Sequence, residues 1–468
     1  ALGASRMRIG QQLLTESFLL SVAGGITGLF WAIWAARVLA TFAGSGLNPV
    51  MLDIHLDARL LAFSFALTLL TGVIFGVTPA WLAATGGVVR HRRANVAPWI
   101  SSGQVALAVT LLAAAGAFTS TLRNLRAQDL GFDRDRVLLV WTAPEQTGHS
   151  GKSVAALFKN VPARIASVPG VLSASASMIG PLEGTYAEAG RGASPNIVAP
   201  GFFETVGMRI LAGRDFNDHD TESSNAVGIV NVAFARELFG NENPIGRSFE
   251  FRRSSVEIIG VVSDTKFNTA RENKRRMFFI PYTQDSDHLF SMCVVARITG
   301  NSPGLTSRIR DEVRSAVSGL PVSKIDLLSE QLDQSLLFER LTAALATAFA
   351  MLAGGLACIG VYGVVAFSVA RRTNEIGVRV ALGATRADIM TMVLRQSMII
   401  GAVGIAAGIP LSIALLRLSQ TMLFGMRSDD PPIICAAALL MLIVAAIAGL
   451  LPARKAASSE PVVALRHE

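Results

Sequence analysis

Six long apolar stretches limit what this chain can fold into. Each contains about 20 residues or more, the length that a helix needs to cross the hydrocarbon core of a bilayer. They lie at approximately 13–42, 60–84, 99–122, 336–370, 390–416 and 432–451. Few charged residues lie within them, and Glu16, Glu339, Arg340 and Arg395 lie near helix ends, where long side chains reach the interface. The sequence therefore predicts an integral membrane α-helical protein with six transmembrane helices.

The composition agrees with a membrane protein and excludes several other classes. Of the 468 residues, 51% are hydrophobic and only 16% are charged, whereas about a quarter of a soluble domain is charged. A disordered chain and an ordinary cytosolic enzyme are therefore excluded. The three cysteines form no disulfide framework, because Cys358 and Cys435 lie in predicted membrane helices and leave Cys293 alone outside them.

The net charge of +8 is confined to one part of the chain. Residues 123–335 contain 24 Lys and Arg and 24 Asp and Glu, and the remaining residues contain 18 basic and 10 acidic side chains. A protein that binds nucleic acid carries its basic residues on a soluble domain, whereas this polar block is neutral. We therefore expect no nucleic-acid partner and interpret the excess charge as a signal of membrane topology.

Basic residues in short loops mark the cytoplasmic side of a membrane protein. With six spans, one face receives 13 of them: Arg6, Arg8, Arg90, Arg92, Arg93, Arg371, Arg372, Arg379, Arg386, Arg395, Arg454, Lys455 and Arg466. The other face receives five: Arg37, Arg59, Arg340, Arg417 and Arg427. We expect the first face to be cytoplasmic. Residues 123–335 would then be the periplasmic domain of a multi-pass protein in the bacterial inner (plasma) membrane, with membrane lipid around its helices.

An internal repeat divides the chain. The run Ala1-Leu2-Gly3-Ala4-Ser5-Arg6 recurs 380 residues later as Ala381-Leu382-Gly383-Ala384-Thr385-Arg386. Two glycine pairs recur at the same offset: Gly24 and Gly28, then Gly404 and Gly408. Glycines four residues apart let membrane helices pack closely, so we expect these four in helix contacts, with incidental glycines as the alternative.

The repeat predicts four parts of the chain. Residues 1–98 would hold the last two transmembrane helices of a first repeat and a basic cytoplasmic linker, and 99–122 the first transmembrane helix of the second repeat. Residues 123–335 would form its periplasmic domain, and 336–468 three further transmembrane helices. Because the chain begins with Ala1 rather than Met, we expect it to be a piece of a longer protein.

The segment 371–390, here called the corner segment, is too polar to span a membrane. Thr373 or Asn374 is expected to cap a short helix whose first turn contains Glu375. Glu375 and Arg379 are four residues apart and are expected to pair, while Ile376 and Val380 line an apolar face.

The end of the corner segment carries its own helix signals. Gly383 suits a helix stop, and Thr385 with Asp388 is expected to form a capping box that starts the next helix. Two interpretations of the short helix remain open: an amphipathic helix that lies among lipid headgroups, and a docking surface for a cytosolic partner.

Two motifs resemble those of MacB/FtsX-type ABC transporter permeases. The first contains Arg372, Glu375, Ile376, Gly377, Arg379, Ala381, Leu382, Gly383 and Ala384. The second, at the C-terminus, contains Pro452, Ala453, Arg454, Lys455, Ala456, Ala457, Pro461, Val462, Ala464, Leu465 and Arg466. The order of one helix, a large outer domain and three helices is also similar. Two fused units resemble the duplicated "orphan" branch of that family, and this chain resembles a fragment that lacks most of the first repeat.

The resemblance implies a function. It implies a permease subunit of an ABC-type export or mechanotransmission system, in which a separate cytosolic ABC ATPase (a dimer) drives motion of the periplasmic domain. The ATPase-coupling residues would be Arg372, Glu375, Ile376, Arg379, Val380, Leu382 and Gly383. A periplasmic or outer-membrane partner is a further implied contact. The alternatives are a membrane-anchored scaffold or regulator of cell-envelope enzymes without a transported substrate, and a receptor.

The outer block has the pattern of a mixed α/β domain. Strands are predicted at 136–142, 171–178, 292–298 and 322–328, and helices at 153–168 and 305–317. Two strand–helix–strand units would thus flank an inserted lobe near 196–290, which contains further strands at 226–231 and 256–262 and a helix at 231–239. The domain resembles the family's periplasmic core domain at 200–203, 207–209, 213–216, 230–240, 243–246 and 260–264.

Two patterns superficially suggest chemistry that we do not expect. Residues 148–153 resemble a phosphate-binding loop, but Gln146 occupies the position of its first glycine. Asp215, Asp218, His219 and Asp220 form a possible cluster of metal ligands, with a solvated turn as the alternative. We therefore predict no enzymatic activity, no cofactor and no metal in this chain.

Overall fold

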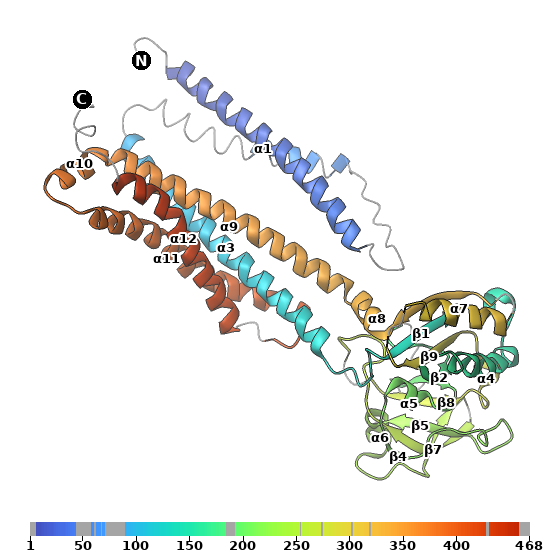
Figure 1. Ribbon diagram of the computed structural model, residues 1–468. Helices are drawn as coiled ribbons and strands as arrows, with labels where there is room; N and C mark the ends of the chain where they lie inside the picture. Colours follow the sequence, from blue (N-terminus) through green and yellow to red (C-terminus); the bar gives the residue numbers. More distant parts are fainter. Residues whose placement is uncertain are drawn as a thin grey trace. The chain divides into compact units, whose positions relative to one another are not determined.

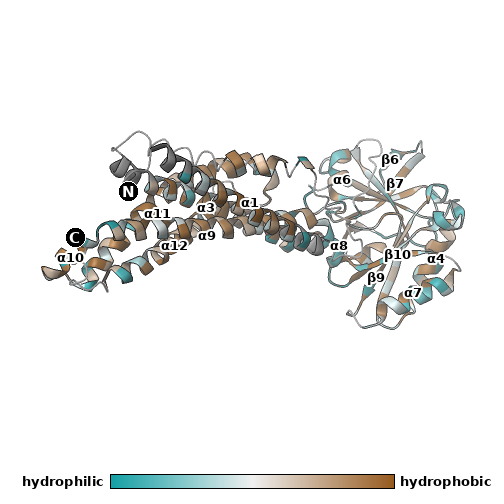
Figure 2. Ribbon diagram, turned by 90° about the horizontal axis from the view of Figure 1, so that it is seen from above, coloured by the Kyte–Doolittle hydropathy of each residue, from teal (hydrophilic) through white to brown (hydrophobic). Residues whose placement is uncertain are grey.

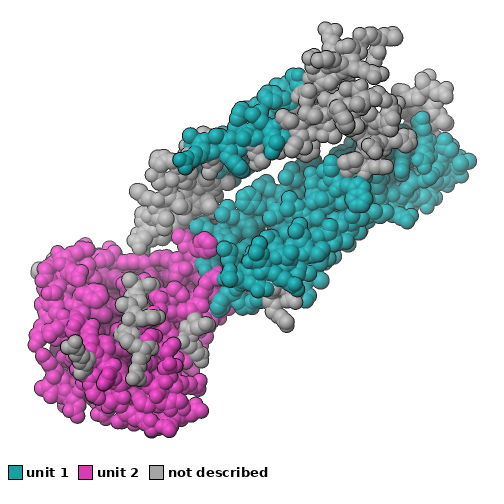
Figure 3. Space-filling view, turned by 180° about the vertical axis from the view of Figure 1, so that it is seen from behind, with its two compact units in different colours: residues 1–122, 339–468 teal, residues 123–338 magenta. Residues whose placement is uncertain are grey.

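The computed structural model describes residues 6–43, 58–59, 62–66, 68–70, 89–183, 192–252, 254–272, 275–300, 303–317, 320–426 and 430–457. The chain divides into two compact units (Figures 1 and 3): unit 1 comprises residues 1–122 and 339–468, and unit 2 comprises residues 123–338. Unit 2 coincides closely with the polar block that charge counting separated from the apolar stretches. Each unit is described by itself below.

Unit 1 is helical. Its long helices are α1 (Arg6–Ala43), α3 (Val89–Ala127), α9 (Leu337–Arg371), α11 (Arg386–Leu418) and α12 (Pro431–Ala457), with the short helices α10 (Thr373–Ala381) and η4 (Gln420–Met422). Among the described residues, four helical segments are long and apolar enough to cross a membrane: Ala97–Ala127, α9, α11 and α12.

Four of the six predicted spans thus have a matching helix, and the described residues do not test the other two in full. The stretch predicted at 13–42 lies within α1, where the qualifying apolar part of the described residues is only Ser21–Trp34. Most of the stretch predicted at 60–84 lies outside the described residues.

Helix α3 is the centre of the membrane bundle. In its most apolar window 56% of the residues are buried, against 17% for α9 and 33% for α11 and α12. The shared core is built from small and β-branched side chains, such as Val105, Ala357, Val393 and Ala448. Small residues allow the close helix approach on which packing within a bilayer depends.

The helices of the bundle consist largely of apolar residues, as the hydropathy colouring shows (Figure 2). On α9, large apolar side chains are exposed at Phe349, Met351, Leu352, Leu356 and Ile359. Exposed apolar surface of this extent is unfavourable in water. It is the surface expected of a helix that faces lipid.

Unit 2 contains one ten-stranded sheet. Its first part is a split βαβ arrangement, made of β1 (Val137–Thr142), α4 (Lys152–Ala166), β2 (Val171–Ser177), β9 (Met292–Ile298), α7 (Leu305–Ala316) and β10 (Val322–Leu327). These strands lie in the antiparallel order β10-β1-β9-β2. Helices α4 and α7 pack on the strands through Phe158, Ile165 and Ile309. The four strands and two helices predicted from the sequence are confirmed, each within two residues at either end.

The inserted residues extend the same sheet. They form β3 (Ser194–Val198), α5 (Phe202–Val206), β4 (Ile210–Gly213), β5 (Val227–Asn231), α6 (Val232–Phe239), β6 (Ser248–Phe251), β7 (Ser254–Val262) and β8 (Met277–Pro281). The sequence predicted a separate lobe, and these elements do have their own core around Phe234, Phe249 and Phe278. The sheet is nevertheless continuous, because β3 pairs with β2 at Ser177 and Val198.

Short helices complete unit 2: η1 (Pro144–Thr147), η3 (Ser286–His288) and α8 (Leu328–Ser335). Helix α8 directly follows β10, and α9 begins two residues after α8 ends. The chain therefore passes from the edge strand of the sheet into a membrane helix with almost no intervening linker.

Candidate functional site

The corner segment begins where α9 ends. Only Arg372 separates α9 from α10, and its backbone N–H donates to the carbonyls of Ser368 and Val369. The hydroxyl of Thr373 donates to the carbonyls of Val369 and Ala370, at 3.3 and 2.9 Å. The predicted cap by Thr373 or Asn374 is wrong: Arg372 is the N-cap residue, without a side-chain cap, because Thr373 bonds back to α9 instead.

Helix α10 is attached to the bundle by one face. Ile376 is only 3% exposed and belongs to the shared bundle core. Val380 is partly buried against the same core. Complete burial of an isoleucine side chain contributes about 1.5–3 kcal/mol. The predicted apolar face is therefore real, but it contacts this chain's own helices.

The exposed side chains of α10, and of Leu382 directly after it, include charged and apolar groups. A guanidinium nitrogen of Arg379 lies 2.7 Å from Glu375 Oε1, which confirms the predicted pair. Arg379 also lies 2.8 Å from the sulfur of Met392. Val378 is half exposed, and Leu382 is 82% exposed. A partner that contacts this helix would meet Glu375, Arg379 and these two apolar side chains.

The turn from α10 to α11 follows the sequence signals. Gly383 has a φ of +99°, a left-handed conformation that favours glycine. Its N–H donates to the carbonyl of Val380. Thr385 is the N-cap of α11, and its backbone N–H donates to Asp388 Oδ2 at 2.9 Å. The predicted capping box is therefore confirmed, and it fixes the direction in which α11 leaves the corner.

A cavity of about 400 Å³ lies beside the corner segment. Its polar lining comes from Ser368, Arg372, Arg395 and Gln396. Its apolar lining comes from Pro98, Val369, Ile376, Met392, Val393, Ile399 and Ile400. Sequence reasoning assigned Arg395 only to a helix end and missed the cavity, because the lining combines α3, α9, α10 and α11.

The glycine pair on α11 lies in a helix contact, as predicted. A Cβ atom on Gly404 would lie 2.6 Å from the Ser102 carbonyl oxygen, and one on Gly408 would lie 2.9 Å from the Ala106 carbonyl oxygen. The hydroxyl of Ser102 also donates across the contact to the Ile400 carbonyl at 3.1 Å. Helices α3 and α11 therefore meet backbone to backbone.

The glycine pair on α1, Gly24 and Gly28, shows no such contact among the described residues. Among the described residues, no atom lies within 4 Å of a Cβ built on Gly24 or Gly28, whereas Gly25 approaches Thr68. A packing role for Gly24 and Gly28 stays a prediction.

The loop that resembles a phosphate-binding motif is closed by its own contacts. The Gly151 N–H donates to the carbonyl of Leu289, and the Ser153 N–H donates to that of Ser150. Lys152 forms an ion pair with Glu222 at 3.1 Å. Because these donors are used within the domain, the loop offers no cradle for a phosphate.

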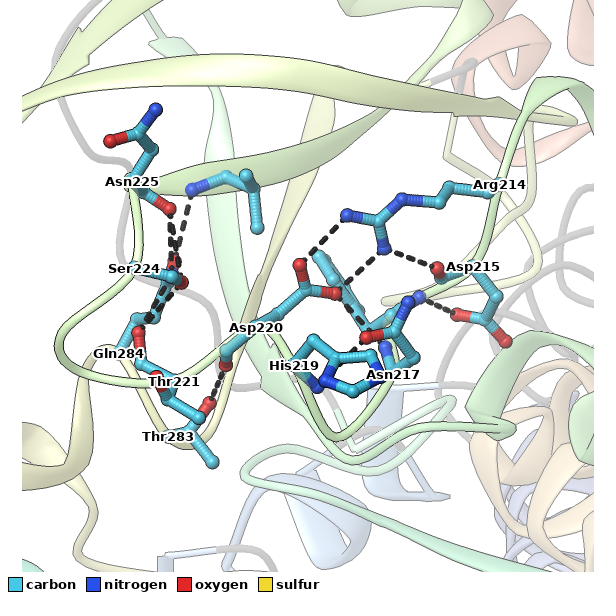
Figure 4. Close-up of polar contacts among 12 residues, drawn as sticks. Arg214, Asp215, Asn217, His219, Asp220, Thr221, Ser224, Asn225, Thr283 and Gln284 are labelled. Atoms are coloured by element: carbon cyan, nitrogen blue, oxygen red, sulfur yellow. Dashed lines mark hydrogen bonds and ion pairs between the residues drawn. The ribbon is translucent and has the colours of Figure 1, made fainter.

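The possible metal ligands around Asp220 form a turn held by an arginine (Figure 4). Two guanidinium nitrogens of Arg214 donate to the two carboxylate oxygens of Asp220, both at 2.8 Å. Gln284 donates to the carbonyls of Thr221 and Asn225, which ties the same loop to the residues after β8. Among the described residues no three ligand-type side chains converge as for a metal ion. Asp220 is only 4% exposed, so this turn is held by a buried carboxylate and is not fully solvated.

A buried polar cluster in unit 2 escaped sequence reasoning. Lys324 and Asp326, on β10, form an ion pair in which the Asp326 side chain is fully buried. Gln334 of α8 donates to Asp326 at 3.0 Å and accepts from Lys324, and Gln331 also accepts from Lys324. The cluster fixes α8 to β10, directly before α9 begins. Its only sequence signal was the i, i+2 spacing of two opposite charges on one face of a strand.

Two family models match this chain. The MacB-like periplasmic core domain matches residues 104–315, and the FtsX-like permease C-terminal domain matches residues 347–461. The first covers most of unit 2, and the second covers the bundle helices after the start of α9 together with the corner segment. The apolar helices and the matched domain define a multi-pass membrane protein with a periplasmic segment.

Several curated relatives are similar over these regions. The macrolide export ATP-binding/permease protein MacB of Aggregatibacter actinomycetemcomitans is 29% identical over 285 residues, which cover 57% of this chain and 42% of that protein. The ABC transporter permease YknZ of Bacillus subtilis is 25% identical over 309 residues, covering 64% of this chain and 77% of that protein. This chain belongs to the MacB/FtsX-type ABC transporter permeases. It spans less than half the length of the MacB relatives it matches first.

Two solved structures of periplasmic or extracellular domains are similar to part of this chain. The periplasmic region of MacB from Actinobacillus actinomycetemcomitans matches 45% of this chain and 97% of its own, with 16% identity and a TM-score of 0.30. The extracellular domain of YknZ matches 40% of this chain and all of its own, with 17% identity and a TM-score of 0.28.

Proposed function

We propose that this chain is a permease subunit that transmits the motion of a separate cytosolic ABC ATPase dimer to the periplasmic domain, in an export or mechanotransmission system. The observation that carries the proposal is that the corner segment has exposed side chains on a helix that is attached to the bundle core. Glu375 and Arg379 of helix α10, and Leu382 directly after it, are exposed, while Ile376 attaches the helix to the bundle core. A force applied to the outer face would therefore displace the ends of α9 and α11.

The connections at the two ends of α9 support transmission of such a displacement. At one end α9 is bonded to α10 through Arg372 and Thr373. At the other end it follows α8, which the Lys324–Asp326 cluster fixes to the sheet. A continuous helix of 35 residues joins the two. Since an α-helix is stiff along its axis, a shift at the corner would reach the edge of the sheet.

The interior of the bundle favours a conformational relay over an ion-coupled carrier. In the described part of the four spans the buried polar residues are Ser101, Ser102, Thr110, Thr121, Ser397 and Ser412, and none is charged. Ion-coupled transporters keep ionisable side chains within the membrane. Substrate would then be moved on the periplasmic side, with a periplasmic or outer-membrane partner.

The proposed arrangement includes the wider organisation of the chain. Residues 99–468 would belong to a second repeat, and 1–98 would be the last two helices and the linker of a first repeat. The protein would lie in the bacterial inner membrane with the corner segment in the cytoplasm.

Reconstitution tests the ATPase coupling. The full chain is placed in proteoliposomes, the cytosolic ABC ATPases of the host are added one at a time, and association and ATP turnover are measured. Glu375→Ala and Arg379→Ala should weaken both for the cognate ATPase. A matched control removes an exposed Arg–Glu pair of unit 2, Arg164 and Glu312, which lie 3.3 Å apart, and should change neither. The proposal fails if the corner variants leave association and turnover at the level of the control.

The same proteoliposomes distinguish export from the alternative function as a scaffold or regulator of cell-envelope enzymes. ATP-dependent movement of a candidate substrate supports export. Stimulated ATP turnover that instead activates a cell-envelope enzyme, without substrate movement, supports the scaffold or regulator.

A further inference from the structure

The cavity beside the corner segment has a cationic end. Two guanidinium groups line it, that of Arg372 after the last turn of α9 and that of Arg395 in the third turn of α11. The Ser368 hydroxyl donates to the Gln396 amide oxygen at 3.0 Å, which orients the Gln396 amide so that its N–H groups remain donors. The lining residues include no carboxylate. Among the described residues that line the cavity, both charged side chains are therefore positive.

The other end of the cavity is apolar and open. Ile399 lines the cavity and is 53% exposed, one helical turn beyond Arg395. Val403, a further turn along α11, and Phe367 on α9 are also exposed. The cationic end is thus continuous with the apolar outer surface of the membrane helices. A ligand that fits both parts has an anionic head and a hydrocarbon chain.

The position of the two arginines corresponds to the headgroup layer. Arg372 lies at the end of one membrane helix, and Arg395 lies nine residues from the start of another, from where a long side chain reaches the interface. Guanidinium groups bind phosphate oxygens with two parallel hydrogen bonds, more strongly than a neutral donor does. A cavity of about 400 Å³ accommodates a headgroup phosphate and the first methylenes, and the acyl chains would lie along the exposed apolar side chains.

We propose that this cavity binds an anionic phospholipid of the cytoplasmic leaflet, with the headgroup phosphate between Arg372 and Arg395 and an acyl chain over Ile399. The inference rests on the membrane position of the bundle and not on coupling to an ATPase. Bound lipid would fill the space between the ends of α9 and α11. It would also contact α10, because Ile376 lines the cavity.

Lipid titration tests the site. The purified full chain in detergent is titrated with phosphatidylglycerol or phosphatidylcholine, and bound lipid is counted by native mass spectrometry. We expect phosphatidylglycerol to bind more tightly. Each of Arg372→Gln and Arg395→Gln should weaken its binding about fivefold, which corresponds to about 1 kcal/mol for each basic group. The double variant should weaken it about 25-fold. Arg386→Gln removes the same charge from an exposed position of α11 that does not line the cavity, and should leave the affinity unchanged.

A second variant keeps both charges. Ile399→Trp fills the open end of the cavity and should weaken phosphatidylglycerol binding at least fivefold without changing the elution volume of the protein. The proposal is overturned if phosphatidylcholine binds equally well, if Arg386→Gln weakens binding as much as the cavity variants, or if the cavity variants retain wild-type affinity. Retained lipid affinity together with lost ATPase association would assign the two arginines to a protein carboxylate instead.

Discussion

Replacement of Gly404 by alanine tests the close contact between α3 and α11. The new Cβ would lie 2.6 Å from both the Ser102 carbonyl oxygen and the Val105 Cβ, which is closer than van der Waals contact allows. Because both atoms belong to the backbone or lie next to it, the helices must move apart. Overpacking of this kind costs about 1–3 kcal/mol. Alanine recovers up to about 1 kcal/mol through its higher helix propensity. With the full recovery, the expected net loss of unfolding free energy is therefore up to about 2 kcal/mol.

A matched glycine provides the control. Gly355 is exposed on α9, and no atom lies within 4 Å of a Cβ built on it. Gly355→Ala should therefore leave the stability unchanged or raise it by up to about 1 kcal/mol. Unfolding by sodium dodecyl sulfate in mixed micelles, followed by far-UV circular dichroism, measures both variants. If Gly404→Ala is as stable as Gly355→Ala, the helices do not meet at Gly404 and the packing argument is refuted.

Three further predictions concern the sheet and the corner. Asp326→Ala leaves the largely buried Lys324 ammonium without its carboxylate partner, with only the two glutamine oxygens as acceptors. It should lower the unfolding free energy of unit 2 by about 3 kcal/mol in thermal unfolding of the full chain. Glu222→Ala, at an exposed pair, should have little effect. Burial raises the pKa of the Cys293 thiol well above its usual value of about 8.5. As the pH rises, the thiol therefore loses its proton in the unfolded chain before it does in the folded one. The wild type should lose unfolding free energy relative to Cys293→Ala above about pH 8.5. A difference in unfolding free energy between the two proteins that stays constant from pH 7 to 10 would contradict this. Ile376→Ala should destabilise the bundle by about 2–4 kcal/mol, as measured by unfolding. Leu382→Ala should leave the stability unchanged but weaken ATPase binding, as measured by co-sedimentation with proteoliposomes.

The elements that sequence patterns predicted correctly are those whose signals are local. The Glu375–Arg379 pair and the Thr385–Asp388 capping box each involve residues three or four positions apart, so the helix itself brings them together. Gly383 has the backbone conformation that its residue type favours. Strand and helix patterns at the two ends of unit 2 were likewise sufficient to predict its two strand–helix–strand units, but not the order of the strands in the sheet.

The features that were missed depend on contacts between distant parts of the chain. Thr373 has the residue type of a cap, but the carbonyls of α9 are within reach and accept its hydroxyl instead. Ile376 has the pattern of an exposed apolar face, but the core of the helix bundle buries it. The cavity combines Pro98 of α3 with residues of three later helices. Local periodicity contains no information about which helix packs on which, and these features follow from that packing.

Cross-linking from the corner segment tests the central claim most directly. A photoreactive amino acid is introduced at Leu382, which is 82% exposed after α10, and in a separate variant at Leu418, which is 83% exposed at the opposite end of α11. In proteoliposomes with the cognate ATPase, illumination should join Leu382 to the ATPase, with a yield that changes between nucleotide-free and ATP-bound states. Leu418 should give no such product. Equal cross-linking from both positions, or none from Leu382 while ATP turnover is stimulated, would contradict the proposal that the corner segment receives the motion of the ATPase.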